Sequence, residues 1–146
     1  MDPLSLTASV IAVATLAWQS SKAAYDVVDG LMEAPNAIAD SKRLLSQPQT
    51  TLDTLRDTLT VGTETPGALD SALQKIKLDI ALESARCLCD EFRKTMTRYT
   101  SHSTDLRFSN RDRFTVNLHE SKIIKFNKQL GECQRTISLV LVSINL

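Results

Sequence analysis

The cysteines and histidines are the side chains of this sequence best suited to metal binding or nucleophilic chemistry. Cys87 and Cys89 are separated by one residue, whereas zinc ribbons and redox-active dithiols place two residues between their cysteines. On a helix two such thiols point about 200° apart, which favours core cysteines over a shared metal ion. No histidine or third cysteine lies close in sequence to complete a site, so we expect no metal and no cofactor.

The other polar residues do not form a recognisable catalytic motif. His102 falls in a polar stretch and His119 at the edge of an apolar pattern, so both are expected to be surface or structural histidines. Glu83, Asp90 and Glu91 lie on a charged helix face and are not paired across an evident cleft. The sequence has no glycine-rich phosphate loop, no nucleophile elbow and no His-Glu-x-x-His motif. We therefore expect a protein that is not an enzyme.

The composition indicates one folded helical domain covering residues 1–146. The chain is 42% hydrophobic and 23% charged, with only four glycines and four prolines, which favours helix over disorder. Its formal net charge is zero, so no nucleic-acid partner is expected. The odd number of cysteines, and a start that is acidic and lacks the basic region of a signal peptide, indicate a cytoplasmic protein.

Apolar periodicity predicts four long helices with short connections, the pattern of an antiparallel four-helix bundle. The first helix runs from about Pro3 to Asp29, with Asp2 as its cap, and the chain breaks firmly by Pro35. The second begins with Asn36 as its cap and should be kinked or split at Pro48, because proline removes a helical hydrogen bond.

The second half of the chain is predicted to hold the third and fourth helices. The third covers about residues 68–98, between loops at 61–67 and 100–104. The fourth follows a cap at Ser109 or Asn110, with the alternative that a short helix precedes it, and continues to the end of the chain. The predicted buried face of the third helix is Leu78, Leu82, Ala85, Cys89, Phe92, Met96 and Tyr99, with Leu69, Leu73, Ile76 and Ile80 on a neighbouring face. That of the fourth is Ile123, Phe126, Leu130, Cys133, Ile137, Val140 and Ile144.

The first helix has no charged side chain from Pro3 to Ser21. At about 1.5 Å per residue this stretch spans about 28 Å, close to the thickness of a bilayer core. It is therefore either the central helix of a bundle or a helix that can meet a membrane, although its serines and threonines disfavour a permanent anchor. We expect a buried central helix in the resting state. The candidates for membrane insertion are Leu4, Leu6, Val10, Ile11, Val13, Leu16 and Trp18.

Charge is distributed unevenly along the chain. Residues 1–60 carry four basic and seven acidic side chains, whereas residues 111–146 carry six basic and three acidic ones, and the two parts should attract each other. Lys122, Lys125 and Lys128 are spaced by three, opposite the apolar face of the last helix. Such a stripe is usually only solvated, but it is our candidate for binding anionic lipid head groups, at about 1 kcal/mol for each cation.

Several segments together resemble one known domain family. They are residues 1–13, Tyr25–Val28, Glu33–Pro35, Arg111–Phe114, Glu120–Lys125, Leu130 and Ile137–Leu141. The sequence resembles the N-terminal domain of fungal NOD-like receptor (STAND) and ankyrin-repeat proteins. This domain is known as the fungal N-terminal or pigment-cluster-protein-L N-terminal domain, and it is related to the HeLo-like group. The resemblance covers nearly the whole chain and departs from the family pattern at Pro48 and Thr115–Asn117.

The resemblance implies a helical signalling or cell-death domain placed before nucleotide-binding and repeat domains in a larger protein. In HeLo-type members the first helix is thought to leave the bundle after homo-oligomerisation and to permeabilise membrane. Our first hypothesis is therefore an effector that is recruited to anionic membrane lipids on activation. The second is a dimerisation or adaptor module that never touches lipid.

Overall fold

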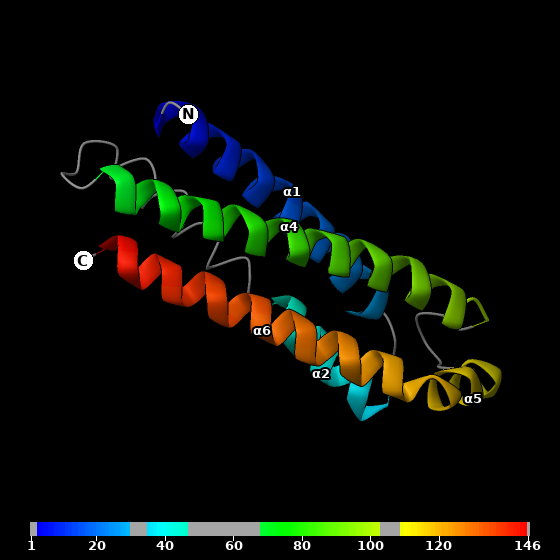
Figure 1. The fold of residues 1–146 in the computed structure, drawn as a ribbon. Helices are drawn as coiled ribbons and strands as arrows, with labels where there is room; N and C mark the ends of the chain where they lie inside the picture. The colour runs from blue at the N-terminus through cyan, green and yellow to red at the C-terminus, as the bar shows by residue number, and fades with distance from the viewer. Residues whose placement is uncertain (1–2, 30–34, 47–67, 103–108, 146) are drawn as a thin grey trace.

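Five α-helices make up the described part of the chain in the computed structural model, which covers residues 3–29, 35–46, 68–102 and 109–145 (Figure 1). They are α1 (Pro3–Asp29), α2 (Asn36–Ser46), α4 (Ala68–Tyr99), α5 (Asn110–Leu118) and α6 (Glu120–Asn145). The predicted all-α helical bundle is confirmed. The last long helix continues to Asn145, as its row of apolar residues predicts.

The structure corrects the predicted cap of α2 and identifies the cap of α5. The carbonyl oxygen of Pro35 accepts from the backbone N–H groups of Ile38 (3.0 Å) and Ala39 (3.1 Å), so Asn36 is the first helical residue and not the cap. The Ser109 hydroxyl accepts from the N–H groups at positions 111 and 112, which caps a short helix, α5, before α6. The predicted short helix before the last long one is therefore confirmed.

Several predictions concern residues outside the described ranges. They are the cap at Asp2, the kink or split at Pro48, the remainder of the predicted second helix and the loop at 61–67. Residues 100–102 form a turn at the end of α4, as predicted for the start of the second loop.

The four longer elements form a ring in the order α1, α4, α6 and α2, with α5 at one end (Figure 1). Chain direction alternates from α1 to α2 to α4 to α6, but α1 and α4 are neighbours and run parallel, as do α2 and α6. Neighbouring helices are thus antiparallel for α1 with α2 and for α4 with α6, and parallel for α1 with α4 and for α2 with α6.

The seam between α1 and α4 is lined on α1 by small side chains. The buried residues of α1 step by four and three: Val10, Ala14, Ala17, Ser21, Ala24 and Val28. Small side chains allow two helices to approach closely. The bulkier Ile11, Trp18 and Tyr25 do not fit between the helices and lie half-buried beside the seam. Among the described helices the backbone of α1 lies close to α4 and α2, and the side of α1 that faces away from the bundle is exposed. The prediction that α1 is a central helix contacted on several sides is therefore wrong within this part of the chain.

The predicted faces of α4 and α6 are buried. All seven predicted residues of α4, from Leu78 to Tyr99, are less than 10% exposed. On α6, Ile123, Phe126, Leu130, Ile137 and Val140 are buried and Cys133 is half-buried, whereas the side chain of Ile144 lies outside the described part.

Helix α2 is held by side-chain hydrogen bonds to its backbone. The last carbonyl groups of a helix have no partner within it. Here the carbonyl of Leu45 accepts from the Ser21 hydroxyl of α1 (2.9 Å), and that of Leu44 accepts from the Gln134 amide of α6 (2.7 Å). One heptad earlier on both helices, the Asn127 amide of α6 donates to the carbonyl of Ala37 (3.0 Å). These bonds set the parallel register of α2 and α6.

The core of the described residues divides into two clusters. The larger joins α2 and α5 to the second halves of α1 and α4 and the first half of α6. The smaller, which we call the N-terminal cluster, joins Val10, Ala14 and Ala17 to Leu78, Ala81 and Leu82 of α4 and to Ile137 and Val140 of α6. The first half of α1 is thus held by the cluster that lacks α2.

A pair of leucines on α6 tests this division between core and surface. Leu130 is 1% exposed and Leu139 is 63% exposed. We expect Leu130→Ala to lower the free energy of unfolding by about 2–5 kcal/mol, because the lost contacts leave a cavity. The matched change Leu139→Ala should alter it by about 0.5 kcal/mol or less. Urea denaturation followed by circular dichroism measures both, and equal effects would contradict the assignment of Leu130 to the core.

Candidate functional site: α1 and the groove between α4 and α6

Most apolar side chains in the first half of α1 contact the bundle. Val10 is fully buried, and Ile11, Val13 and Trp18 pack half-buried against the N-terminal cluster. Leu16 lies outside this contact and is 49% exposed. The structure therefore brings most of the insertion candidates together on the bundle side of α1 and leaves one leucine in solvent.

Two insertion candidates lie nearer the start of α1. Leu4 and Leu6 belong to the helix, but their side chains lie outside the described part of the structure. Within the described ranges, none of the helices combines the length and the apolar character needed to cross a membrane. Membrane insertion of α1 stays a prediction.

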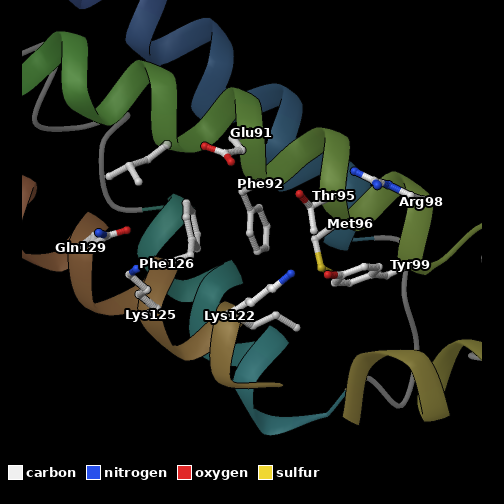
Figure 2. Close-up of a pocket in the computed structure, with 12 residues that line it drawn as sticks. Glu91, Phe92, Thr95, Met96, Arg98, Tyr99, Lys122, Lys125, Phe126 and Gln129 are labelled. Atoms are coloured by element: carbon white, nitrogen blue, oxygen red, sulfur yellow. The ribbon is translucent and has the colours of Figure 1, made fainter. Parts of the chain in front are cut away.

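The lysine stripe lies beside a groove between α4 and α6 (Figure 2). The groove has a volume of about 510 Å³, and Lys122 and Lys125 line it together with Arg98 and Glu91 of α4. Lys122 extends across the groove towards α4, and Lys125 lies at the rim beside Phe126 (Figure 2). Lys128, also exposed, does not line the groove.

The floor of the groove is aromatic and closely packed. Phe92 of α4 and Phe126 of α6 stack with ring centroids 4.1 Å apart and planes 14° from parallel. Both rings are less than 10% exposed, as is Tyr99, which stacks on His119 at 4.9 Å. Because these rings are buried, the accessible part of the groove is its charged rim. A cationic rim of this kind favours contact with phosphate or carboxylate groups.

Two of the acidic residues of α4, Glu83 and Asp90, are paired with an arginine. Arg86 forms ion pairs with Glu83 and Asp90 on the same helix, three and four residues away. Its hydrogen bond to Glu83 lowers the pKa of that carboxyl group. A general acid that works near neutral pH needs a raised carboxyl pKa instead. Within the described ranges no group of three or more His, Cys, Asp or Glu residues could hold a metal ion.

The two neighbouring cysteines have different environments. Cys89 is 1% exposed in the core, as expected, but Cys87 is exposed, so the prediction of a core cysteine is wrong for Cys87. Their separation of about 200° on the helix explains the difference, because one face of α4 cannot hold both thiols. Burial raises the pKa of Cys89 to about 12, and Asp90 and Cys133 act in the same direction. Burial also raises the pKa of Cys133, which lines a second groove with Cys87.

The whole chain, residues 1–146, matches the family described as pigment biosynthesis cluster protein PigL N-terminal. The chain belongs to this family. No curated protein and no solved structure matches it. The match confirms the resemblance to the pigment-cluster-protein-L N-terminal domain that the sequence motifs indicate. A NOD-like receptor or ankyrin-repeat parent protein stays a prediction.

This PigL N-terminal domain exposes apolar residues that sequence reasoning did not assign to a site. Phe114 and Leu118 of α5 are 69% and 67% exposed, although they lie in or near segments that the family resemblance assigned to a closing helix. On α4, Leu73, Ile76 and Ile80 are 43–61% exposed and follow one another at helical spacing. The spacing of Phe114 and Leu118, opposite the apolar Val116, was the sequence signal that could have revealed the first pair.

The thiol environments predict an order of chemical reactivity. The thiolate is the nucleophile, and a pKa of about 12 leaves only about one in ten thousand Cys89 thiols ionised at pH 8. We expect Cys87 to react first with a thiol reagent in the folded protein and Cys89 to react only after unfolding. Labelling followed by mass spectrometry measures the order. Cys87→Ser should abolish the fast phase, whereas a fast phase lost in Cys89→Ser would contradict the burial of Cys89.

Proposed function

We propose that this domain is a non-catalytic effector and signalling domain that acts at membranes when it is clustered. It lies in the cytoplasm at rest, as the N-terminal part of a fungal receptor with nucleotide-binding and repeat domains. Clustering by the parent protein leads to homo-oligomers. In these, α1 leaves the bundle and targets or permeabilises the membrane, as part of regulated cell death.

The observation that supports this proposal is that α1 begins with a long uncharged stretch, yet mostly small side chains of that stretch are buried against the bundle. Residues Pro3–Ser21 are uncharged, yet Ala14 and Ala17 provide much of the buried face of this stretch. Burial of alanine contributes less than burial of leucine or phenylalanine, so removal of this stretch costs on the order of several kcal/mol. Multivalent assembly on a lipid surface can offset a cost of this size.

The described part of α1 also has a polar side that suits a position in the plane of the membrane surface. Gln19, Lys22 and Asp26 are exposed and lie on the side of the helix opposite the buried seam. A helix with one apolar and one polar side binds at the boundary between head groups and acyl chains. Lys122, Lys125 and Lys128 supply positive charge for anionic head groups in this proposal.

Leakage of dye from anionic vesicles tests the proposal with a matched pair of variants on α1. Leu16 and Gln19 are both exposed, so a charge at either position should leave the fold intact. We expect Leu16→Glu to reduce leakage by forced oligomers about tenfold, because it replaces an apolar side chain of the uncharged stretch with a charge. Gln19→Glu should have a smaller effect, because the side chain that it replaces is already polar.

The proposal fails if forced oligomers of the wild-type chain cause no leakage. It also fails if Leu16→Glu leaks as much as the wild type while circular dichroism shows both to be folded. Val10→Asp is a poorer test, because Val10 is fully buried and a charge there would disturb the bundle itself.

The exposed stripe on α4 favours a second candidate function, a dimerisation or adaptor module without membrane activity. Leu73, Ile76 and Ile80 lie three and four residues apart, so they share one side of the helix. Apolar residues in such a row are typical anchors of helix-to-helix docking.

Light scattering and vesicle flotation separate the two functions. An adaptor is expected to form a stable dimer that does not float with anionic vesicles. We expect Ile80→Glu to weaken self-association about tenfold or more, because it places a charge in the apolar row. Ser84→Glu, at an exposed polar position one turn away, is the matched control. Dimers that persist unchanged in Ile80→Glu would rule out this stripe as the interface.

A further inference from the structure

The short helix α5 has one side fixed to the bundle. Asp112 and Val116 are each 1% exposed. The Asp112 carboxylate accepts from the backbone N–H of His102 (2.9 Å), which ties α5 to the turn after α4. Val116 belongs to the larger core cluster. These two contacts determine which side of α5 faces the solvent.

The opposite side of α5 combines large apolar groups with a cation. Phe114 and Leu118 are the two most exposed of the large apolar side chains in the described part of the chain, at 69% and 67%. Exposed Arg111 precedes them at helical spacing, three residues before Phe114 and seven before Leu118. Single exposed apolar residues are ordinary, but an aromatic and a leucine on one side, next to an arginine, form a small amphipathic surface.

The surroundings of α5 are strongly basic. Residues 93–102 and 109–128 carry eight basic and two acidic side chains, and one of the two acids is the buried Asp112. By contrast, residues 68–92, which form the other part of α4, carry three basic and five acidic side chains. Around α5 the described residues of α4, α5 and α6 therefore carry an excess of positive charge, whereas the end of α1 on the same side of the bundle carries Asp26 and Asp29 (Figure 1).

We propose that this end of the bundle is a docking surface for an anionic lipid bilayer, with Phe114 and Leu118 entering the head-group region. Arg111 and the neighbouring basic side chains bind the lipid phosphate and carboxylate groups. A bilayer offers both an anionic surface and an apolar layer beneath it, which matches the two kinds of side chain on α5. An acidic protein or a nucleic acid would match the charge but does not offer that continuous apolar layer.

This inference rests on the proposed membrane function and adds a separate recruitment step to it. The N-terminus of α1 lies at the far end of the bundle from α5, whereas α1 ends at Asp29 on the α5 side (Figure 1). Docking through α5 therefore does not require α1 to move. Docking through α5 would also place the membrane near Asp29, the end of α1 about which the helix would rotate on leaving the bundle.

Vesicle sedimentation of the 146-residue chain tests the surface. The probes are vesicles of phosphatidylcholine and phosphatidylserine in equal parts, with phosphatidylcholine alone as the uncharged comparison. We expect the wild type to bind the mixed vesicles about tenfold or more tightly than the uncharged ones, and high salt to remove the difference. Equal binding to both vesicles, or none to the mixed ones, would overturn the inference, and the second result would favour an acidic macromolecule.

Two matched sets of variants separate the apolar and the charged contributions. Phe114→Ala with Leu118→Ala should weaken binding to mixed vesicles about tenfold or more, whereas Leu139→Ala with Val142→Ala, an equally exposed pair on α6, should not. Arg111→Glu should weaken it by a similar factor, whereas Arg135→Glu, exposed near the other end, should have a smaller effect. Equal effects within either set would overturn the assignment to α5.

A fluorescent reporter provides a second measurement that does not depend on affinity. Trp18 is the single tryptophan of the chain, so Trp18→Phe combined with Phe114→Trp places the only indole on α5. Its emission should shift to the blue when mixed vesicles are added, because the indole enters an apolar layer. An unchanged emission spectrum in protein that sediments with the vesicles would overturn the inference.

The outcomes distinguish this inference from the proposed function. Suppose that forced oligomers cause the same vesicle leakage with and without the changes at 114 and 118. That result would contradict docking through α5 and would be compatible with the proposed role of α1. Alternatively, vesicle binding that requires these two residues, while no forced oligomer causes leakage, would support docking and contradict permeabilisation.

Discussion

The close packing of α1 against α4 is the constraint on which the rest of this bundle depends. A buried face with alanine or serine at four of six positions lets the two helices approach closely and run parallel along their length. Since α1 takes this side of α4, α6 must pack on another side, and α2 closes the ring between α1 and α6. The hydrogen bonds from Ser21, Asn127 and Gln134 to the backbone of α2 then fix where the ring closes.

The same constraint makes the two ends of the bundle unequal. Helix α2 completes the larger cluster near the end where α5 lies, whereas the N-terminal cluster contains side chains of α1, α4 and α6 alone among the described residues. The larger cluster also contains the Phe92 and Phe126 pair and Leu130, while α1 contributes chiefly valine and alanine to the smaller one. Among the described residues fewer apolar side chains therefore hold the first half of α1 than hold its second half.

The spacing of apolar residues in the sequence predicted where the described helices lie and which faces of α4 and α6 are buried, but not which helices are neighbours. The bounds of α1 and the buried faces of α4 and α6 follow from apolar residues that repeat every three or four positions, because that repeat is a property of one helix. The ring order depends on how closely two helices approach, which small side chains such as Ala14 and Ala17 allow but a repeat within one helix does not predict. The same limit applies to the candidate surfaces. The lysine stripe on α6 was visible from spacing, whereas the exposure of Phe114 depends on Asp112 and Val116 turning their side of α5 inward.

The separation between α5 and the start of α1 bears on how a domain of this kind would be controlled. Suppose that the same segment both bound the membrane surface and inserted into it. Any contact with an anionic surface would then favour release of that segment from the bundle, because the free energy of membrane binding would be gained only by the released segment. In this bundle the basic, aromatic end contains the contacts of the larger cluster, and the uncharged helix begins at the other end (Figure 1). A membrane bound at α5 would gain nothing directly from opening the N-terminal cluster, so docking alone would leave α1 in place. Release would then require a further contribution of several kcal/mol, and many docked copies side by side on one surface would be a source of it.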